Sequence, residues 1–278
     1  MSKGTLTFLV DKTFEDLLNA VTEIGNINVT RSKPHFPPCP CKSPLKGRKA
    51  MKVSEFNVKT AEDNRKCHIS DILQLRNSQL LFIDSGNENL KIFRQDFKHA
   101  ESMTLSNYPW NGCILSDTIV AVTLPHKKTI LVIDITDKMR KVREMRTRLQ
   151  CWGISLMKNQ LVITTGEDEH CVIILDMIGT EIRTIRSDNF QDEKLLQPIF
   201  VTYDARQEMI FVSYETGEKL VGYKSSVVQF TYTDSNMQSP TRAVNDREGN
   251  IYLCWYNSFC IQQISAEGKL IKTLNIKN

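Results

Sequence analysis

A two-strand pattern recurs five times along the chain, and it constrains the fold more than any other feature. Each copy has an apolar strand, a turn rich in Gly, Asn, Asp or Ser, and a second apolar strand. Equivalent positions are 40 to 48 residues apart and are occupied by Phe82, Val122, Thr164, Val212 and Leu253. In every copy the next strand starts its apolar core eight positions later. This period is typical of the four-stranded blade of a β-propeller.

The pattern also locates the strands that flank each pair. Inner strands are expected at Ile69–Leu75, Gly112–Leu115, Trp152–Leu156, Ile199–Tyr203 and Arg242–Asn245. Outer strands, in which apolar and polar residues alternate, are expected at Glu181–Ile185 and Lys269–Leu274. We therefore predict an all-β fold, a propeller with five blades visible in the sequence and six blades expected in the ring.

The N-terminal part does not follow the repeat. A strand, a short helix and a second strand are expected within residues 1–32, which makes a small α/β extension. Residues 33–50 contain a cluster of prolines and are predicted to be a linker. The propeller then covers residues 51–278. Within it, residues 53–60 alternate like a strand and are expected to close the ring by joining the last blade.

Composition limits the classes of protein that this chain can belong to. Apolar residues make up 41% and charged residues 24%, near the globular average, which rules out a fully disordered chain. No stretch is long and apolar enough for a membrane span, and no secretory signal is recognisable. The eight cysteines are therefore expected to be reduced thiols of a cytoplasmic protein. The net charge of +4 does not by itself require a nucleic-acid partner.

The fifth repeat carries the clearest family signal. It has Pro240, then Asp-Arg-Glu-Gly-Asn-Ile-Tyr-Leu at 246–253, then Asn257 and Ile261. This resembles the NHL repeat, whose usual form is Pro-x-Gly-Val-Ala-x-Asp-x-x-Gly-x-Ile-Tyr-Val-x-Asp-x-x-Asn. Most of the chain is similar to the C-terminal part of molluscan tripartite-motif-like proteins. The matching stretches are Gly4–Arg31, Glu55–Thr60, Cys67–Asp71, Phe200–Gln207, Phe230–Ser235 and Ile264–Leu274.

The resemblance implies an NHL-type β-propeller that follows a RING, a B-box and a coiled coil in the same chain. In that family the RING supplies ubiquitin ligase activity, and the propeller recognises a protein or an RNA. The zinc-spaced Cys and His pairs of a RING or B-box do not occur here, so no ligase activity is transferred to this chain. The repeats are also degenerate, since Arg242 stands at a usual glycine position and Phe259 and Cys260 replace a polar pair.

Cysteines and histidines that lie close in the sequence are candidates for a metal or nucleophilic site. Cys39 and Cys41, with His35 nearby, have one residue between the thiols, whereas paired zinc thiolates usually have two to four. Cys67–His68 and His170–Cys171 are adjacent pairs, and neighbours in a strand point to opposite faces. A core cysteine beside an exposed histidine is therefore expected at both pairs.

Aspartates recur at blade positions, where a metal-dependent propeller enzyme holds its ion near the central channel. They are Asp71, Asp84, Asp134, Asp176, Asp204 and Asp246. Because they sit at predicted turns, their carboxylates are expected to accept hydrogen bonds from turn amides instead. The other histidines, His99 and His126, fall in predicted outer loops. We therefore predict no catalytic residue, no metal ligand and no cofactor.

One basic run is the strongest candidate for a partner-binding surface, because six cations lie between Lys138 and Arg148 against one acid. The candidate residues are Lys127, Lys128, Arg140, Lys141, Arg143, Arg146 and Arg148, with Trp110 and Trp152 available for stacking. A solvated outer strand gives the same charge pattern, since charges there prevent edge-to-edge pairing. Tryptophans that fill the gap between blades likewise explain Trp110, Trp152 and Trp255.

The sequence favours a non-catalytic recognition or scaffold propeller that binds a protein, linked to ubiquitination only through a partner that brings a RING. An RNA-binding propeller acting in post-transcriptional regulation is the first alternative. A metal-dependent propeller hydrolase or lyase is the second. No membrane partner and no small-molecule substrate are expected.

Overall fold

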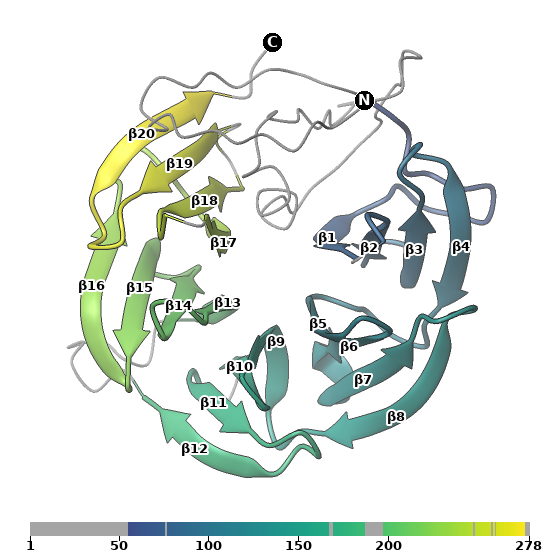
Figure 1. Cartoon of the computed structure of the whole chain (residues 1–278), viewed down its shortest axis with the longest axis horizontal. Helices are drawn as coiled ribbons and strands as arrows, with labels where there is room; N and C mark the ends of the chain where they lie inside the picture. The colour runs from purple at the N-terminus through teal and green to yellow at the C-terminus, as the bar shows by residue number, and fades with distance from the viewer. Residues whose placement is uncertain are drawn as a thin grey trace.

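Five antiparallel sheets of four strands each make up the structure, and they are called blades 1 to 5 here. The computed structural model describes residues 55–275, with gaps at 76, 167–168, 187–196, 247, 257 and 259. The blades stand around a common axis in an arc that has blade 1 at one end and blade 5 at the other (Figure 1). The predicted all-β propeller fold is confirmed.

Each blade is built from consecutive strands that run from the axis outward (Figure 1). Blade 1 comprises β1 (Ile69–Gln74), β2 (Leu80–Asp84), β3 (Asn89–Phe93) and β4 (His99–Thr104). Blade 2 comprises β5 (Gly112–Ser116), β6 (Ile119–Leu124), the 3-10 turn η3 (Pro125–Lys127), β7 (Thr129–Asp134) and β8 (Arg140–Arg146). Blade 3 comprises β9 (Gln150–Met157), β10 (Gln160–Gly166), β11 (Val172–Leu175) and β12 (Glu181–Ile185). Blade 4 comprises β13 (Pro198–Asp204), β14 (Met209–Tyr214), β15 (Lys219–Lys224) and β16 (Val227–Thr233). Blade 5 comprises β17 (Pro240–Asn245), β18 (Ile251–Trp255), β19 (Cys260–Ile264) and β20 (Leu270–Asn275).

Residue type decides which layer of a blade each strand occupies. The middle strands β2 and β3 are buried at every position, because neighbouring elements cover both faces of the sheet. The outer strand β8 leaves most of its side chains exposed, and its sequence is correspondingly charged. Between blades 1 and 2, Leu81 and Ile83 pack in one cluster with Val120 and Val122. Similar clusters fill the other interfaces between consecutive blades.

The strand positions follow the sequence closely. All five expected inner strands are present as β1, β5, β9, β13 and β17, with ends within two residues of the expected ones. The expected outer strand at Glu181–Ile185 is β12, and that at Lys269–Leu274 is β20, shifted by one residue. The predicted extension at 1–32 and linker at 33–50 lie outside the described residues, as does any sixth blade that they would complete.

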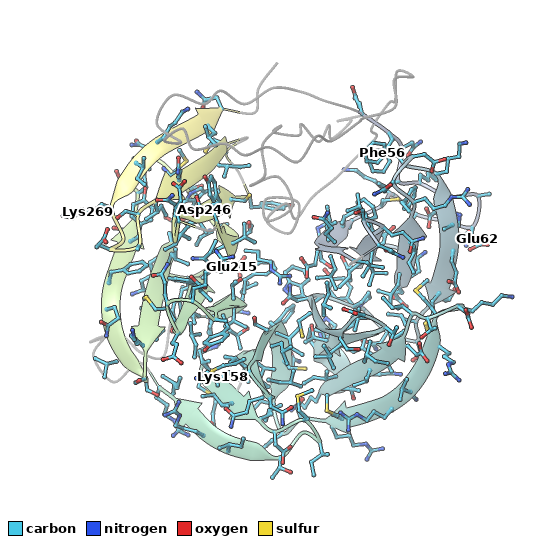
Figure 2. The ribbon with its side chains drawn as sticks, in the orientation of Figure 1. Phe56, Glu62, Lys158, Glu215, Asp246 and Lys269 are labelled. Carbon is cyan, nitrogen blue, oxygen red and sulfur yellow. The ribbon has the colours of Figure 1, made fainter. Side chains whose placement is uncertain are left out.

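The closing strand expected at residues 53–60 is not observed in the part of this segment that the structure describes. Phe56 and Val58 are buried in a cluster with Ile69, Ile72 and Phe82, all of blade 1. Figure 2 shows Phe56 beside blade 1, at the end of the arc. Blade 5 has four strands of its own, β17 to β20. The alternation of this segment therefore reflects two apolar side chains, Phe56 and Val58, that pack on the face of blade 1 turned away from blade 2.

A polar network fills the axis where the inner strands converge. Arg242 of β17 places Nη1 2.5 Å from Oδ2 of Asp71 in β1, and it also donates to the carbonyl oxygen of Gly112 at 3.2 Å. Oδ2 of Asp71 further accepts from the amide of Gly112 at 2.9 Å and from the side-chain amide of Asn111 at 2.7 Å. Oδ1 of Asn111 accepts from the amide of Ile154 at 2.8 Å. This axial network joins blades 1, 2, 3 and 5.

The axial ion pair is almost fully removed from water. Asp71 is 1% exposed and Arg242 is 7% exposed. Burial raises the pKa of Asp71, and the neighbouring charge of Arg242 only partly offsets this effect. Asp71 was expected to be a turn residue, and that prediction is wrong because its side chain points to the axis from within β1. Arg242, which departs from the NHL-like pattern, is the partner that makes this burial tolerable.

Hydroxyl groups of second strands connect each of three blades to the next one. Thr123 of β6 donates to the carbonyl oxygen of Trp152 at 2.7 Å, and Thr164 of β10 donates to that of Ile199 at 3.1 Å. Ser213 of β14 donates to the carbonyl oxygen of Thr241. Thr123 and Thr164 are fully buried and Ser213 is 1% exposed, so these bonds lie inside the interfaces. They fix the start of the inner strands β9, β13 and β17 relative to the preceding blade.

Replacing Arg242 with methionine is expected to destabilise the protein by about 3–5 kcal/mol, because it leaves the buried Asp71 carboxylate without its counter-charge. Urea unfolding of Arg242→Met, Asp71→Asn and the double variant forms the test. The double variant should be more stable than Arg242→Met, since it carries no uncompensated buried charge. Equal stability of wild type and Arg242→Met would show that the axial pair does not hold the blades together.

Candidate functional site

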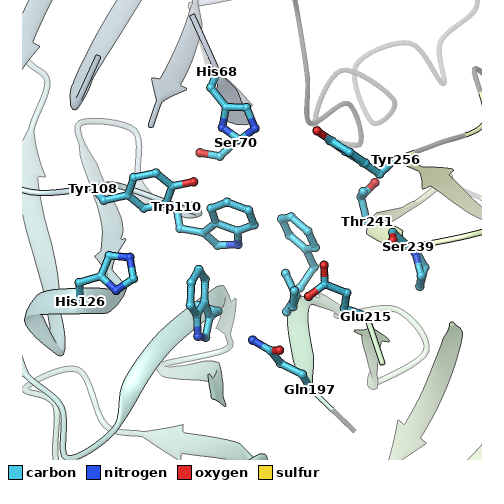
Figure 3. Close-up of a pocket in the computed structure, with 14 residues that line it drawn as sticks. His68, Ser70, Tyr108, Trp110, His126, Gln197, Glu215, Ser239, Thr241 and Tyr256 are labelled. Carbon is cyan, nitrogen blue, oxygen red and sulfur yellow. The ribbon is translucent and has the colours of Figure 1, made fainter. Parts of the chain in front are cut away.

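A cavity of about 440 Å³ opens at one end of the axis, and all five blades contribute to its lining (Figure 3). This axial pocket lies where the inner strands begin and where the second strands end. Ser70 of blade 1, Trp110 of blade 2 and Trp152 of blade 3 line it, as do Phe200 of blade 4 and Thr241 of blade 5. Its volume falls in the range of about 300–1,000 Å³ that is usual for ligand sites.

Trp110 is the centre of an aromatic cluster in this pocket. Its ring is stacked with Tyr108 at a centroid distance of 5.9 Å and with Phe200 at 5.8 Å. It meets Trp152 edge to face, at 5.3 Å and an angle of 89°. His126 approaches Trp152 in the same way at 5.8 Å. The walls are therefore two tryptophans at right angles with smaller rings around them, an arrangement that offers several aromatic faces.

Hydrogen bonds from one buried residue, Thr123, hold the backbones of both tryptophans. The carbonyl oxygen of Thr123 accepts from the amide of Trp110 at 3.0 Å, and the Thr123 hydroxyl donates to the carbonyl oxygen of Trp152. Gly166 leaves room for the Trp152 indole, since a Cβ there would lie 2.7 Å from its Nε1. Thr123 and Gly166 are therefore positioning residues for the pocket.

Three residues of the axial network each follow, in the sequence, a residue that lines the pocket. Ser70 precedes Asp71, Trp110 precedes Asn111, and Thr241 precedes Arg242. Ser70 and Asp71 lie in β1, and Thr241 and Arg242 lie in β17, where neighbouring side chains point to opposite sides of the strand. Trp110 and Asn111 precede β5 and divide in the same way, since Trp110 lines the pocket and Asn111 donates to Asp71. The axial hydrogen bonds thus set the positions of the pocket walls.

Glu215 is the carboxylate among the lining residues, and no Lys or Arg lines the pocket. It follows β14 directly and is exposed at the rim. Figure 3 shows its carboxylate directed toward the space between the aromatic rings. In the described part of the chain no cation is paired with this side chain. The pocket is therefore mainly aromatic, with one negative charge at its entrance.

Two histidines contribute to the lining, His68 before β1 and His126 in η3. Nδ1 of His68 lies 2.6 Å from Oγ of Ser85, whose hydroxyl donates to the carbonyl oxygen of His68 at 2.9 Å. Since the hydroxyl hydrogen is used there, Nδ1–H of His68 is the donor to Ser85, and this bond fixes the ring. The expectation that His126 lies in an outer loop is wrong, because η3 connects the second and third strands at the pocket end of blade 2.

The structure separates the candidate residues of the sequence into two places. Trp110 and Trp152 lie in the axial pocket, whereas Arg140, Lys141, Arg143 and Arg146 lie on β8, the outermost strand of blade 2 (Figure 1). Lys127 and Lys128 lie in and after η3, and Arg148 follows β8. The basic strand and the tryptophans therefore do not form one continuous surface.

Several cations of the basic run are already paired. Arg140 pairs with Asp134, Lys141 with Glu144 and Arg148 with Glu169, and Arg143 donates to the carbonyl oxygen of Met177. Lys127 donates to the hydroxyl of Ser106. This pairing reduces the positive potential of the outer strand compared with what the sequence suggests.

A group of potential metal ligands lies inside blade 1. Sγ of Cys67 and carboxylate oxygens of Asp63 and Asp84 lie within 4.8 Å of one another. The ammonium of Lys91 stands among them, 2.6 Å from each carboxylate and 3.3 Å from Sγ of Cys67. All three charged side chains are 0% exposed. Lys91 thus occupies the position at which these ligands would hold a cation.

The opposite charges of Lys91, Asp63 and Asp84 keep one another ionised in spite of their burial. Burial is the largest single influence and opposes ionisation of both carboxyl groups. The hydrogen bonds and charge of Lys91, together with hydrogen bonds from neighbouring amide groups, outweigh it and keep the pKa values of Asp63 and Asp84 below the usual range. Burial likewise opposes the charged lysine, and the bonds to Asp63 and Asp84 still raise the pKa of Lys91.

The other recurrent aspartates behave as the sequence predicts. Carboxylates of Asp134, Asp176, Asp204 and Asp246 accept from amides two residues later in their turns. Asp84 also accepts from turn amides in addition to its bond with Lys91. These residues are structural caps within the turns.

The comparisons with known proteins identify the fold. No family model matches the chain, and no curated protein matches it either. A solved structure of catalytically inactive virginiamycin B lyase from Staphylococcus aureus with quinupristin is similar at TM-score 0.62 and 11% identity, covering 98% of this chain and 88% of that one. A nidogen/laminin complex gives TM-score 0.63 at 14% identity, covering 75% and 80%. A protein of unknown function from Bacteroides caccae gives 0.64 at 14%, covering 92% of both chains.

These identities are low, so the similarity establishes a β-propeller fold and leaves the activity open. The NHL and tripartite-motif resemblance remains a prediction from the sequence. Within the described residues no helix has the length and hydropathy needed to cross a membrane.

Replacing Lys91 with methionine is expected to destabilise the protein by about 3–5 kcal/mol near neutral pH, because two buried carboxylates lose their counter-charge. In wild type, the depressed pKa values of Asp63 and Asp84 give stability that is complete above their ordinary pKa and is lost as pH falls through the folded values. In the variant these carboxyl groups bind protons more readily when folded. The stability difference between the two proteins, measured by urea unfolding, should therefore shrink from about pH 7 to about pH 4.5. A constant difference would contradict the cluster's role.

The described cysteines are expected to be unreactive in the folded protein. All six are buried, and burial raises the pKa of Cys113 and of Cys67 to about 12 and that of Cys151 to about 11. A Cys39→Ser/Cys41→Ser variant isolates these six thiols for titration with a chromogenic disulfide reagent. We expect no rapid reaction before denaturant is added and six thiols after it. One fast thiol in native buffer would contradict the described burial.

Proposed function

We propose that this propeller is a non-catalytic recognition module that binds a protein partner through the axial pocket. The observation that carries the proposal is the aromatic cluster around Trp110 and Trp152 in a preformed cavity at one end of the axis. Tryptophan and tyrosine dominate the binding energy of protein interfaces when a partner group enters a pocket that they line. The same module fits a substrate-recognition role in ubiquitination, in which another protein supplies the RING.

The position of the pocket supports binding to a protein segment. It opens between loops from every blade, so a partner that enters it also meets the rim residues Glu215, Tyr256 and His126. Tyr256 is 49% exposed, so about half of its side chain is accessible to a partner at the rim. A cytoplasmic location, in which the thiols stay reduced, is part of this proposal.

RNA binding is kept as an alternative outcome of the experiment. Its support in the sequence was the basic run, and in the structure that run lies on the outer strand with several of its cations paired. The carboxylate of Glu215 at the pocket entrance would repel phosphate groups. We therefore place the partner at the pocket and assign no RNA contact to it.

A capture experiment with three proteins tests the proposed function. Wild type, a pocket variant with Tyr108→Ala and Tyr256→Ala, and an outer-strand variant with Arg143→Glu, Arg146→Glu and Arg148→Glu are compared on the same beads, with and without RNase. We expect the pocket variant to lose about 10- to 30-fold of its bound partner, as for interface hot spots. The outer-strand variant and RNase treatment should leave the capture unchanged. Loss on charge reversal or with RNase, with the pocket variant intact, would overturn the proposal.

A further inference from the structure

We propose that the axial pocket binds an organic cation, presented by the protein partner as a lysine or arginine side chain. This inference rests on the proposed function, because it names the chemical group that the partner inserts. It is carried by three observations on the same cavity: its aromatic lining, a rim carboxylate that no cation of the described residues pairs with, and the pairing of the basic residues that adjoin the lining in sequence.

The aromatic faces are the first observation. Trp110 and Trp152 stand at right angles, and Trp110 also stacks with Tyr108 and Phe200. An aromatic face carries a negative quadrupole and attracts a cation, most strongly when the ring is the indole of tryptophan. Two of the three tryptophans of the chain lie in this one pocket. A cation that enters the cavity therefore lies among aromatic side chains from blades 2, 3 and 4.

The charge of the pocket is the second observation. Glu215 is negatively charged at the rim and has no cation paired with it among the described residues. Figure 3 shows it across the cavity from Trp110 and Tyr108, so a group that enters the cavity lies between the rings and the carboxylate. An anionic ligand would be repelled there, and a neutral one would leave the carboxylate without a partner. A cation is therefore the ligand that satisfies both parts of the site.

The neighbouring cation is the third observation. Arg242 follows the lining residue Thr241 and is the basic residue closest in sequence to the pocket wall of blade 5. Its guanidinium is paired with Asp71 at 2.5 Å on the axis and is 7% exposed as a residue. Its positive charge is therefore compensated and does not oppose a cation in the pocket. Lys127, next to the lining residue His126, donates to Ser106 at the surface of blade 2.

A matched pair of small probes separates charge from shape. Choline carries a quaternary ammonium, and 3,3-dimethylbutan-1-ol has the same outline with a carbon in place of the nitrogen. Binding of each probe to the full chain is followed by the change in tryptophan fluorescence, since two of the three tryptophans, Trp110 and Trp152, line the pocket. We expect choline to bind about 3- to 30-fold more tightly than the neutral alcohol, the preference that cation–π contacts produce. N-acetyl-lysine methylamide and its norleucine counterpart repeat the comparison with a protein side chain.

Glu215→Gln tests the carboxylate, and Glu62→Gln is its control because Glu62 is an exposed acid at the outside of blade 1 (Figure 2). Glu215→Gln should reduce the affinity for choline several-fold and leave that for the neutral alcohol unchanged. Glu62→Gln should change neither. Melting curves confirm that each variant is folded.

The possible results distinguish the inference from the proposed function. Equal affinity for choline and the alcohol, or no binding of either probe to a folded protein, would overturn the cation assignment. If the capture of a protein partner still depends on Tyr108 and Tyr256 in that case, the recognition function stands without it. If choline is preferred and Glu215→Gln removes the preference, while no partner depends on the pocket, the cation site stands and the recognition function fails.

Discussion

The contact between Asp71 and Arg242 is the interaction on which the arrangement of the blades depends. Apolar clusters join each blade to the next one along the chain, and they need only neighbouring segments to form. The axial pair is different because it connects β1 at one end of the arc to β17 at the other. Two charges in a dry axis are tolerated only with good geometry and further hydrogen bonds, and Gly112 and Asn111 supply these.

The pocket wall and the axial network are formed by consecutive residues of the same segments. Ser70, Trp110 and Thr241 face the cavity, while the residues that follow them hold the axial network. Any change that moves the network by a fraction of an ångström also moves the aromatic walls. The pocket therefore has the rigidity expected of a preformed recognition site, although its lining comes from loops and strand ends of every blade. Thr123 adds to this rigidity by bonding the backbone of both tryptophans.

The fold could be predicted from the sequence because its signals are local. Apolar runs such as Leu80–Asp84 and Thr129–Asp134 are buried on both faces, and their spacing repeats with each blade. The candidate site could be predicted only in part. Trp110 and Trp152 were identified, but they were grouped with a basic strand that is close in sequence and lies at the periphery in space. Glu215 and Tyr256 were missed, since each follows a second strand and only its place at the axis gives it a role.

The axial network could be predicted even less well from the sequence. Asp71 resembles the turn aspartates of the other blades in the sequence, and no local pattern indicates an arginine partner 171 positions away. The hydroxyl groups of Thr123, Thr164 and Ser213 did leave a signal, because each interrupts the apolar run of a second strand near its end. A polar residue at that place in several repeats is a sign of contacts between blades.

The separation of 171 positions between Asp71 and Arg242 also bears on when the axial pair can form during synthesis. During synthesis the chain emerges from its N-terminus, so blade 1 is complete long before β17 leaves the ribosome. Asp71 therefore spends most of translation without its arginine, next to partners that come only from blade 2. The long loop between the two residues must close before their attraction acts, and this closure has an entropic cost that grows with loop length. The axial pair can therefore form only after β17 has joined blades 1 and 2, and the aromatic walls beside it depend on the same step.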